Sequence, residues 1–179
     1  GYAYWYEVRL MAGAIVNPYA IAAAGPSAYE EAVLEDTPLG LWMLDETSGT
    51  VAEDKGSVGE DGDYGSTYSP TLGTRTVFGL TCPDFASADV VIVPDNAGFD
   101  SYTGASGTMT WEFVFNYDTQ ASIAFVWWKD FATIKTGGSY MVSVDSWETF
   151  PSVLVFRTND TTAVATGTDY HVVLTFDRA

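Results

Sequence analysis

Five acidic residues crowd a short, glycine-rich loop, and their side chains are the best suited in this chain to metal chemistry. The acidic residues and the glycines between them are Glu53, Asp54, Gly56, Gly59, Glu60, Asp61, Gly62 and Asp63. Hard oxygen ligands on a flexible loop suit calcium, although the spacing does not follow the EF-hand pattern. The loop therefore has two interpretations: a calcium site with ligands among Asp54, Glu60, Asp61 and Asp63, or a hydrated acidic loop without a cofactor.

Aromatic residues in the second half of the chain are candidates for sugar binding, because aromatic rings suit the apolar faces of pyranoses. Trp147 and Phe150 lie close to Pro151 in an expected loop, and with Tyr140 they form the candidate glycan-binding set. The alternative is packing in the core or between subunits, because interfaces are also rich in aromatic residues.

Catalytic motifs are not apparent. His171 is the only histidine and has no nucleophile motif near it, so we interpret it as a structural strand histidine. Glycoside hydrolysis needs paired carboxylates, but Glu112 is isolated on its expected strand face, and Asp145 and Glu148 lack the alternation of glycosidase strands. Cys82 is the single cysteine, which excludes an internal disulfide and indicates a buried, inert thiol. We predict that the protein is not an enzyme.

The charge of the chain limits its partners. Seven basic and twenty-four acidic residues give a net charge of −17. Such a chain is not expected to bind nucleic acid through phosphate contacts or to insert into or adhere to an anionic membrane. The acidic surface either provides solubility or docks onto a basic scaffold.

A short helix and a strand precede the acidic loop and must position it. Ser27 and Glu30 have capping-box spacing, which predicts a helix from Ser27 to Leu34. Pro38 ends it, because the residue before a proline is disfavoured in the α region. The apolar run 39–44 then predicts a strand that is covered on both faces.

Short apolar or alternating runs dominate the rest of the chain and predict an all-β fold. The clearest run is 110–117, with Trp111, Phe113, Phe115 and Tyr117 on one face. Further strands are expected at 88–93, 122–128, 139–144, 152–157, 162–166 and 170–176. The number and spacing of these strands favour a two-sheet antiparallel sandwich.

Three motifs near the first strand resemble those of laminin-G-like, concanavalin A-like jelly-roll domains, especially domains of phage structural proteins. They are Ala-Val-Leu-Glu-Asp-Thr-Pro at 32–38, Gly-Leu-Trp-Met-Leu-Asp-Glu-Thr-Ser-Gly-Thr at 40–50, and the stretch from Asp54-Lys-Gly to Asp63-Tyr64. Looser matches at 83–95, 107–115 and 170–177 extend the resemblance over about residues 27–177. Met43 stands where the family usually has arginine. The resemblance implies a jelly-roll sandwich, a virion role, and calcium at a sheet rim.

The ends of the chain indicate assembly. Residues 1–26 are expected to form an extended arm, and Ile15, Val16, Pro18, Tyr19 and Ile21 are its predicted assembly residues. A signal peptide over 11–25 is the alternative, although Pro18 interrupts it. The absence of an initial methionine, the candidate start at Met11 and the abrupt end after a strand predict a piece of a longer polypeptide, with the sandwich of 27–179 incomplete at its C-terminus.

The resemblance to phage jelly-roll domains implies a phage virion structural protein, either a capsid decoration or a tail or fibre component, on the virion surface after assembly in the host cytoplasm. Its expected partners are other virion subunits, such as a major capsid or tail protein, further copies of itself, and a host-surface glycan. The alternative is a secreted or surface carbohydrate-binding domain of a larger adhesin or hydrolase. Fold alone does not distinguish the two, because jelly rolls serve both.

Overall fold

The computed structural model describes residues 3–11, 26–65, 67, 69–86, 88–100, 107–118, 124–129, 132–137, 140–147, 154–159 and 165–178. These parts are mostly antiparallel strand with one α-helix, so the predicted all-β class is confirmed. The chain divides into two compact units. Residues 4–116 and 169–179 form the larger unit, and residues 1–3 and 117–168 form the smaller one.

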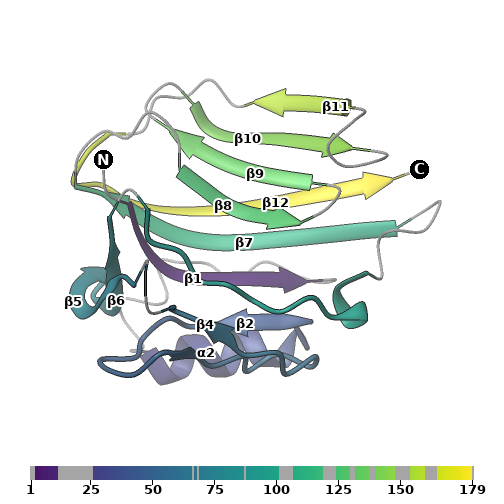
Figure 1. The fold of residues 1–179 in the computed structure, drawn as a ribbon. Helices are drawn as coiled ribbons and strands as arrows, with labels where there is room; N and C mark the ends of the chain where they lie inside the picture. The colour runs from purple at the N-terminus through teal and green to yellow at the C-terminus, as the bar shows by residue number, and fades with distance from the viewer. Residues whose placement is uncertain are drawn as a thin grey trace. The chain divides into compact units, whose positions relative to one another are not determined.

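The larger unit is built on a six-stranded sheet with the order β12-β7-β1-β6-β5, in which β2 also pairs with β1 (Figure 1). Its strands are β1 (Ala3–Met11), β2 (Gly40–Trp42), β5 (Thr71–Val77), β6 (Leu80–Phe85), β7 (Gly107–Tyr117) and β12 (Asp169–Arg178). A two-stranded ribbon of β3 (Val51–Ala52) and β4 (Gly62–Asp63) carries the acidic loop, and a 3-10 helix, η1, spans Ala97–Asp100.

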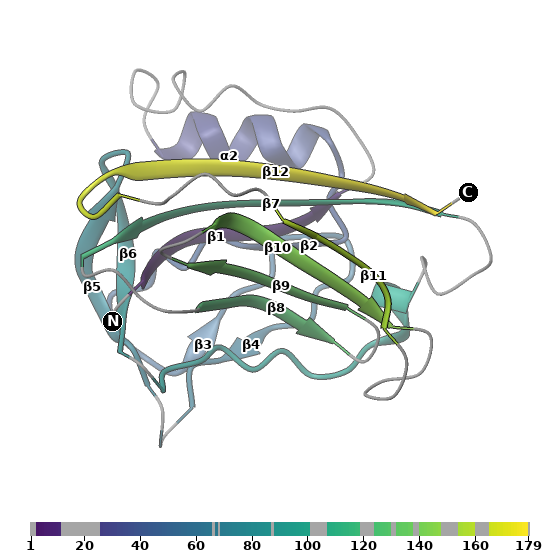
Figure 2. The ribbon, with the colours of Figure 1, turned by 90° about the horizontal axis from the view of Figure 1, so that it is seen from above.

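The smaller unit holds a four-stranded antiparallel sheet with the order β11-β10-β9-β8, whose strands lie side by side in Figure 2. They are β8 (Ala124–Lys129), β9 (Ala132–Gly137), β10 (Tyr140–Trp147) and β11 (Leu154–Asn159). Consecutive strands pair throughout, so this sheet is a simple meander.

The predicted helix is confirmed as α2, which spans Pro26–Glu35. Proline suits the first turn of a helix because its missing N–H would be unpaired there in any case. At the other end Thr37 has a φ of 51° and donates its N–H to the Leu34 carbonyl. This left-handed residue followed by Pro38 stops the helix and turns the chain into β2.

The core of the larger unit joins α2 to one face of the sheet. Its cluster of buried residues is Tyr29, Val33, Leu41, Met43, Val77, Leu80, Cys82 and Val114. Tyr29 and Val33 are one helical turn apart, so both face the sheet. Because Leu41, Trp42, Met43 and Leu44 are all buried, the prediction that the run 39–44 needs cover on both faces is confirmed.

Strand β7 is buried on both of its faces. Trp111, Phe113 and Phe115 alternate with Glu112 and Val114, and all five are nearly inaccessible to solvent. Phe115 stacks on Tyr170, which lies directly opposite in β12, with ring centroids 5.3 Å apart. The aromatic face predicted from the sequence is therefore a packed face, continuous across two strands.

The β5–β6 hairpin was not predicted. Its two-residue turn is Phe78-Gly79, and both residues have positive φ, at 50° and 80°, as the hairpin turn of type I′ requires. The Asp169 carboxylate holds this turn, accepting hydrogen bonds from Phe78 N at 2.7 Å and from Asn116 Nδ2 at 2.6 Å. A long-range contact thus stabilises a non-glycine residue in the left-handed region.

Most of the strand predictions are confirmed, with shifted ends: 110–117, 122–128, 139–144, 152–157 and 170–176 correspond to β7, β8, β10, β11 and β12. The predicted strand 88–93 is wrong, because only Ile92 forms a bridge, to Asp63. In 162–166, the described residues 165–166 are not in a strand. Strands β1 and β9, like β5 and β6, were not predicted, and β1 lies within the segment interpreted as an arm.

Candidate functional site

The acidic loop is organised around Asp54, which is 8% exposed. Its Oδ1 accepts hydrogen bonds from Leu41 N and Gly56 N, both at 2.8 Å, and its Oδ2 accepts one from Glu60 N at 2.9 Å. A carboxylate that receives three backbone N–H groups satisfies donors that would otherwise be buried and unpaired. Asp54 therefore fastens the acidic loop to strand β2.

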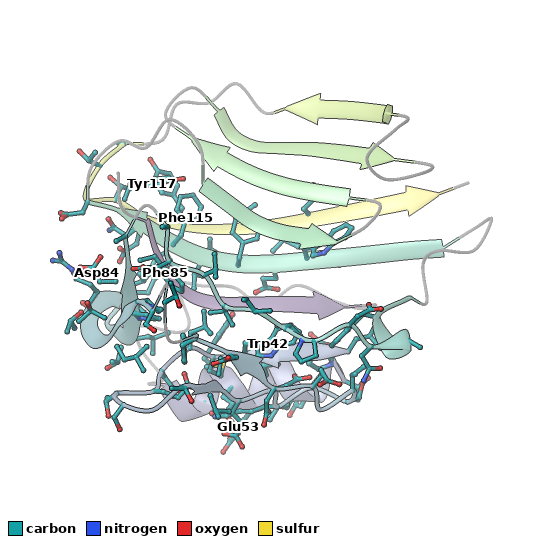
Figure 3. All side chains as sticks on the ribbon, viewed as in Figure 1. Trp42, Glu53, Asp84, Phe85, Phe115 and Tyr117 are labelled. Carbon is teal, nitrogen blue, oxygen red and sulfur yellow. The ribbon has the colours of Figure 1, made fainter. Side chains whose placement is uncertain are left out.

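The remaining predicted metal ligands have separate partners. Asp61 Oδ1 accepts a hydrogen bond from Asp54 N at 2.9 Å, and Asp63 Oδ1 accepts one from Gly65 N at 2.8 Å. Glu60 Oε2 accepts a hydrogen bond from Asn96 Nδ2 at 2.7 Å. The Glu60 carbonyl also accepts one from the Trp42 indole, at 3.1 Å. Figure 3 shows Trp42 on the side of this loop opposite to Glu53.

The carboxylates predicted to bind calcium accept hydrogen bonds from different donors. In the part of the chain that the structure describes, no group of three or more histidine, cysteine, aspartate or glutamate side chains could hold a metal ion. The four predicted ligands, Asp54, Glu60, Asp61 and Asp63, are neighbours along the chain, but their oxygens serve different backbone and side-chain donors. The calcium site is thus left as a prediction to be tested by titration.

The Glu46 carboxylate also holds the acidic loop by accepting hydrogen bonds at its two ends. Its Oε1 accepts a hydrogen bond from Glu53 N at 2.9 Å, and its Oε2 accepts one from the Tyr64 hydroxyl at 2.5 Å. Burial and the negative charge of Glu46 raise the pKa of Tyr64 well above its ordinary value. The phenol therefore stays protonated and acts as a hydrogen-bond donor.

A buried polar cluster lies between α2 and the sheet. Glu112 is completely buried, and its Oε1 contacts His171 Nε2 at 2.6 Å and accepts a hydrogen bond from the Tyr29 hydroxyl at 3.3 Å. The β7–β12 register explains the pairing: His171 lies opposite Val114, two residues from Glu112 on the same face. The interpretation of Glu112 as isolated is wrong. The only indication of the Glu112–His171 contact in the sequence was a single acidic residue and a single histidine, each on an apolar strand.

The thiol of Cys82 is fully buried in the core cluster. Burial, with Asp169 and Asp84 nearby, raises its pKa to about 12. Because the thiolate is the reactive form of cysteine, the interpretation of an inert thiol agrees with this environment.

The predicted glycan-binding and assembly residues lie largely outside the described residues. Tyr140 and Trp147 begin and end strand β10, so the backbone separates them by the full length of that strand, and their side chains lie outside the described set. Phe150 and the arm residues Ile15, Val16, Pro18, Tyr19 and Ile21 fall entirely outside the described residues.

A surface that the sequence did not predict lies on the exposed side of the β3–β4 ribbon. The residues Asp63 and Ile92 exchange two backbone hydrogen bonds, of 2.8 and 2.9 Å, and Val51 lies opposite Asp63 in β3. Exposed and covered residues alternate along 51–54, 61–64 and 90–94. We call the exposed set the acidic–apolar face: Val51, Glu53, Asp61, Asp63, Val90 and Ile92.

Comparisons with protein-family models, with curated proteins and with solved structures gave no match. Within the described chain, no helix has the length and apolarity needed to cross a membrane. The functional argument therefore rests on the residues and their contacts.

Proposed function

We propose that this chain is a non-enzymatic structural protein of a phage virion, a capsid decoration or a tail or fibre component, that displays a laminin-G-like jelly roll. The observation that carries the proposal is the hydrogen bonding of Asp54. The motif that resembles the jelly-roll family contains this residue, and its carboxylate holds strand β2, Gly56 and Glu60 together. The motif acts as a structural joint, as expected of a display scaffold.

The two-sheet sandwich is the finer part of the same proposal. Its support is the burial of residues 110–115 of β7 on both faces together with the size of the two antiparallel sheets. In a sandwich the inner faces of two sheets supply the core, and the aromatic row of β7 has the composition of such a face.

Partners follow from charge and from the N-terminal segment. We propose that residues between β1 and α2 contact other virion subunits, that copies of the chain self-associate, and that the exposed part displays a glycan-binding surface to the host. A chain with a net charge of −17 is suited to a basic partner.

The test is the location of the chain in native particles. Antibodies raised against the whole chain should label purified phage particles that encode it, and mass spectrometry of those particles should recover its peptides in fixed proportion to the major capsid or tail protein. Recovery of the chain only from the secreted or cell-surface fraction would instead support a carbohydrate-binding domain. Glycan arrays with and without calcium then test the displayed surface.

A further inference from the structure

We propose that segment 90–93 is an open sheet edge that binds an extended segment of another protein, one in which lysine or arginine alternates with aliphatic residues. The inference goes beyond the proposed function. It depends only on described residues of the larger unit, and it holds equally for a virion subunit or a cell-surface domain.

The first argument is the backbone. Ile92 donates its N–H to the Asp63 carbonyl and accepts the Asp63 N–H at its own carbonyl. In antiparallel geometry its neighbours therefore direct their N–H and C=O groups to the opposite side. Among the described residues neither Val91 nor Val93 takes part in a bridge. Segment 90–93 is therefore joined to the β3–β4 ribbon by the single bridge of Ile92, and its outer side is an edge that can pair with another chain.

The second argument is the side chains beside that edge. Ile92 is 59% exposed, Val51 52% and Val90 40%. Ile92 and Val90 share the exposed face of segment 90–93, and Asp63 separates Ile92 from Val51. The opposite face is closed, because a Cβ on Gly62 would approach Val91 Cγ1 to 2.6 Å. An added strand would place its own side chains beside Ile92 and Val90 on the exposed face without disturbing the packed side.

Charge identifies the occupant. Glu53, Asp61 and Asp63 are exposed in the same face, and segment 86–100 contains acidic residues but no lysine or arginine. The one cation of the loop, Lys55, is bound to Glu30 at 2.9 Å. A basic partner would balance these charges, whereas a second copy of this chain would bring another −17.

The reach of a basic side chain fits this arrangement. A strand added beside 90–93 lies two strand spacings from Asp63, about 10 Å. A lysine or arginine side chain and the aspartate side chain span that distance together. The apolar stem of the basic residue would lie over Ile92 while its charged end meets the carboxylate.

The experiment uses the whole chain and a fluorescein-labelled nine-residue peptide of alternating lysine and valine, with binding followed by fluorescence anisotropy. Val91→Pro leaves the charge unchanged and removes an edge N–H, as proline does on edge strands. We expect it to weaken binding about tenfold or more. Ile92→Lys should do the same, and Asp61→Asn with Asp63→Asn should also reduce the salt dependence.

Two controls keep the test independent of folding. Leu34→Lys changes an exposed apolar residue of α2 that is 37% accessible, and it should leave binding close to that of the wild type. A peptide N-methylated at alternate residues tests the backbone hydrogen bonds without altering the protein. Its affinity for the wild-type chain should be as low as that of the unmethylated peptide for Val91→Pro.

Four results would overturn the proposal. In the first, the peptide does not bind the wild-type chain. In the second, the peptide binds Val91→Pro as tightly as the wild type and the N-methylated peptide binds the wild type undiminished, so that the attraction is only electrostatic. Sedimentation shows a dimer that Val91→Pro dissociates, so that a second copy is the occupant. Hydrogen exchange finds the amides of Val91 and Val93 protected in the free monomer, so that the chain itself covers the edge.

Discussion

Asp54 and Asp63 lie nine positions apart in one acidic loop, yet the fold uses them in opposite ways. Asp54 is buried and receives three backbone N–H groups, whereas Asp63 is exposed and receives one, from the nearby Gly65. The same contrast separates the buried Glu112 from the exposed Glu53, which points away from the ribbon in Figure 3. A carboxylate stabilises this fold where it satisfies buried donors, and it is available to a partner where water surrounds it.

The largest expected effect is at Asp54. Asp54→Ala leaves the N–H groups of Leu41, Gly56 and Glu60 without their acceptor, and we expect a loss of about 3 kcal/mol or more in the free energy of unfolding. Urea denaturation followed by circular dichroism measures it. Asp63→Ala is the matched control and should change stability by less than about 0.5 kcal/mol. Equal losses at the two positions would contradict the contrast between buried and exposed carboxylates.

Gly56 tests the close approach between the acidic loop and the backbone of residues 39–40, which the hydrogen bonds of Asp54 hold together. A Cβ at this position would lie 2.6 Å from Gly40 Cα and 2.6 Å from the Leu39 carbonyl oxygen. Because both obstacles are backbone, Gly56→Ala should cost about 3 kcal/mol. Gly59→Ala meets nothing within 4 Å but has a φ of 69°, so we expect about 1 kcal/mol there. The thermal midpoints of the two variants should differ accordingly, and a smaller loss for Gly56→Ala would argue against a tight joint.

Glu112 extends the comparison to the core. Glu112→Leu leaves His171 Nε2 and the Tyr29 hydroxyl without this carboxylate, and we expect a loss of about 2 kcal/mol. The double variant Glu112→Leu with His171→Leu should lose less than the sum of the two single variants, because it no longer strands one polar partner. Strict additivity in denaturation experiments would mean that the 2.6 Å contact contributes no coupling.

At neutral pH the smallest effect is expected from the Cys82 thiol, whose contribution changes only at high pH. The pKa of the Cys82 thiol is raised from 9.0 to about 12 in the folded chain. An unfolded chain therefore loses this proton at a lower pH than the folded chain. The resulting stabilisation is complete below pH 9 and is lost progressively as the pH rises toward 12. Cys82→Ala should flatten this part of the stability profile, and Ellman's reagent should label the native thiol only after unfolding. Rapid labelling at pH 8 without denaturant would contradict the burial.

Local signals explain which elements were predicted correctly. Helix α2 has a terminating Asp-Thr-Pro and an apolar pair at helical spacing, and β7 alternates large aromatic with smaller residues from Trp111 to Tyr117. Those patterns depend on neighbours along the chain. By contrast, β5 has few apolar residues and is mostly exposed, and β6 contains Pro83. Neither strand carries a strong local pattern, and pairing with each other defines them.

The candidate sites divide in the same way. The sequence by itself determined the all-β class, the helix before strand β2 and the acidity of the loop, because composition and period depend only on residue types. Only the tertiary structure decided that Asp54 is a buried joint, that Glu112 meets His171, and that Val51, Asp63 and Ile92 share one exposed row. Register and burial set those roles, and both arise from contacts between segments that are distant in the chain.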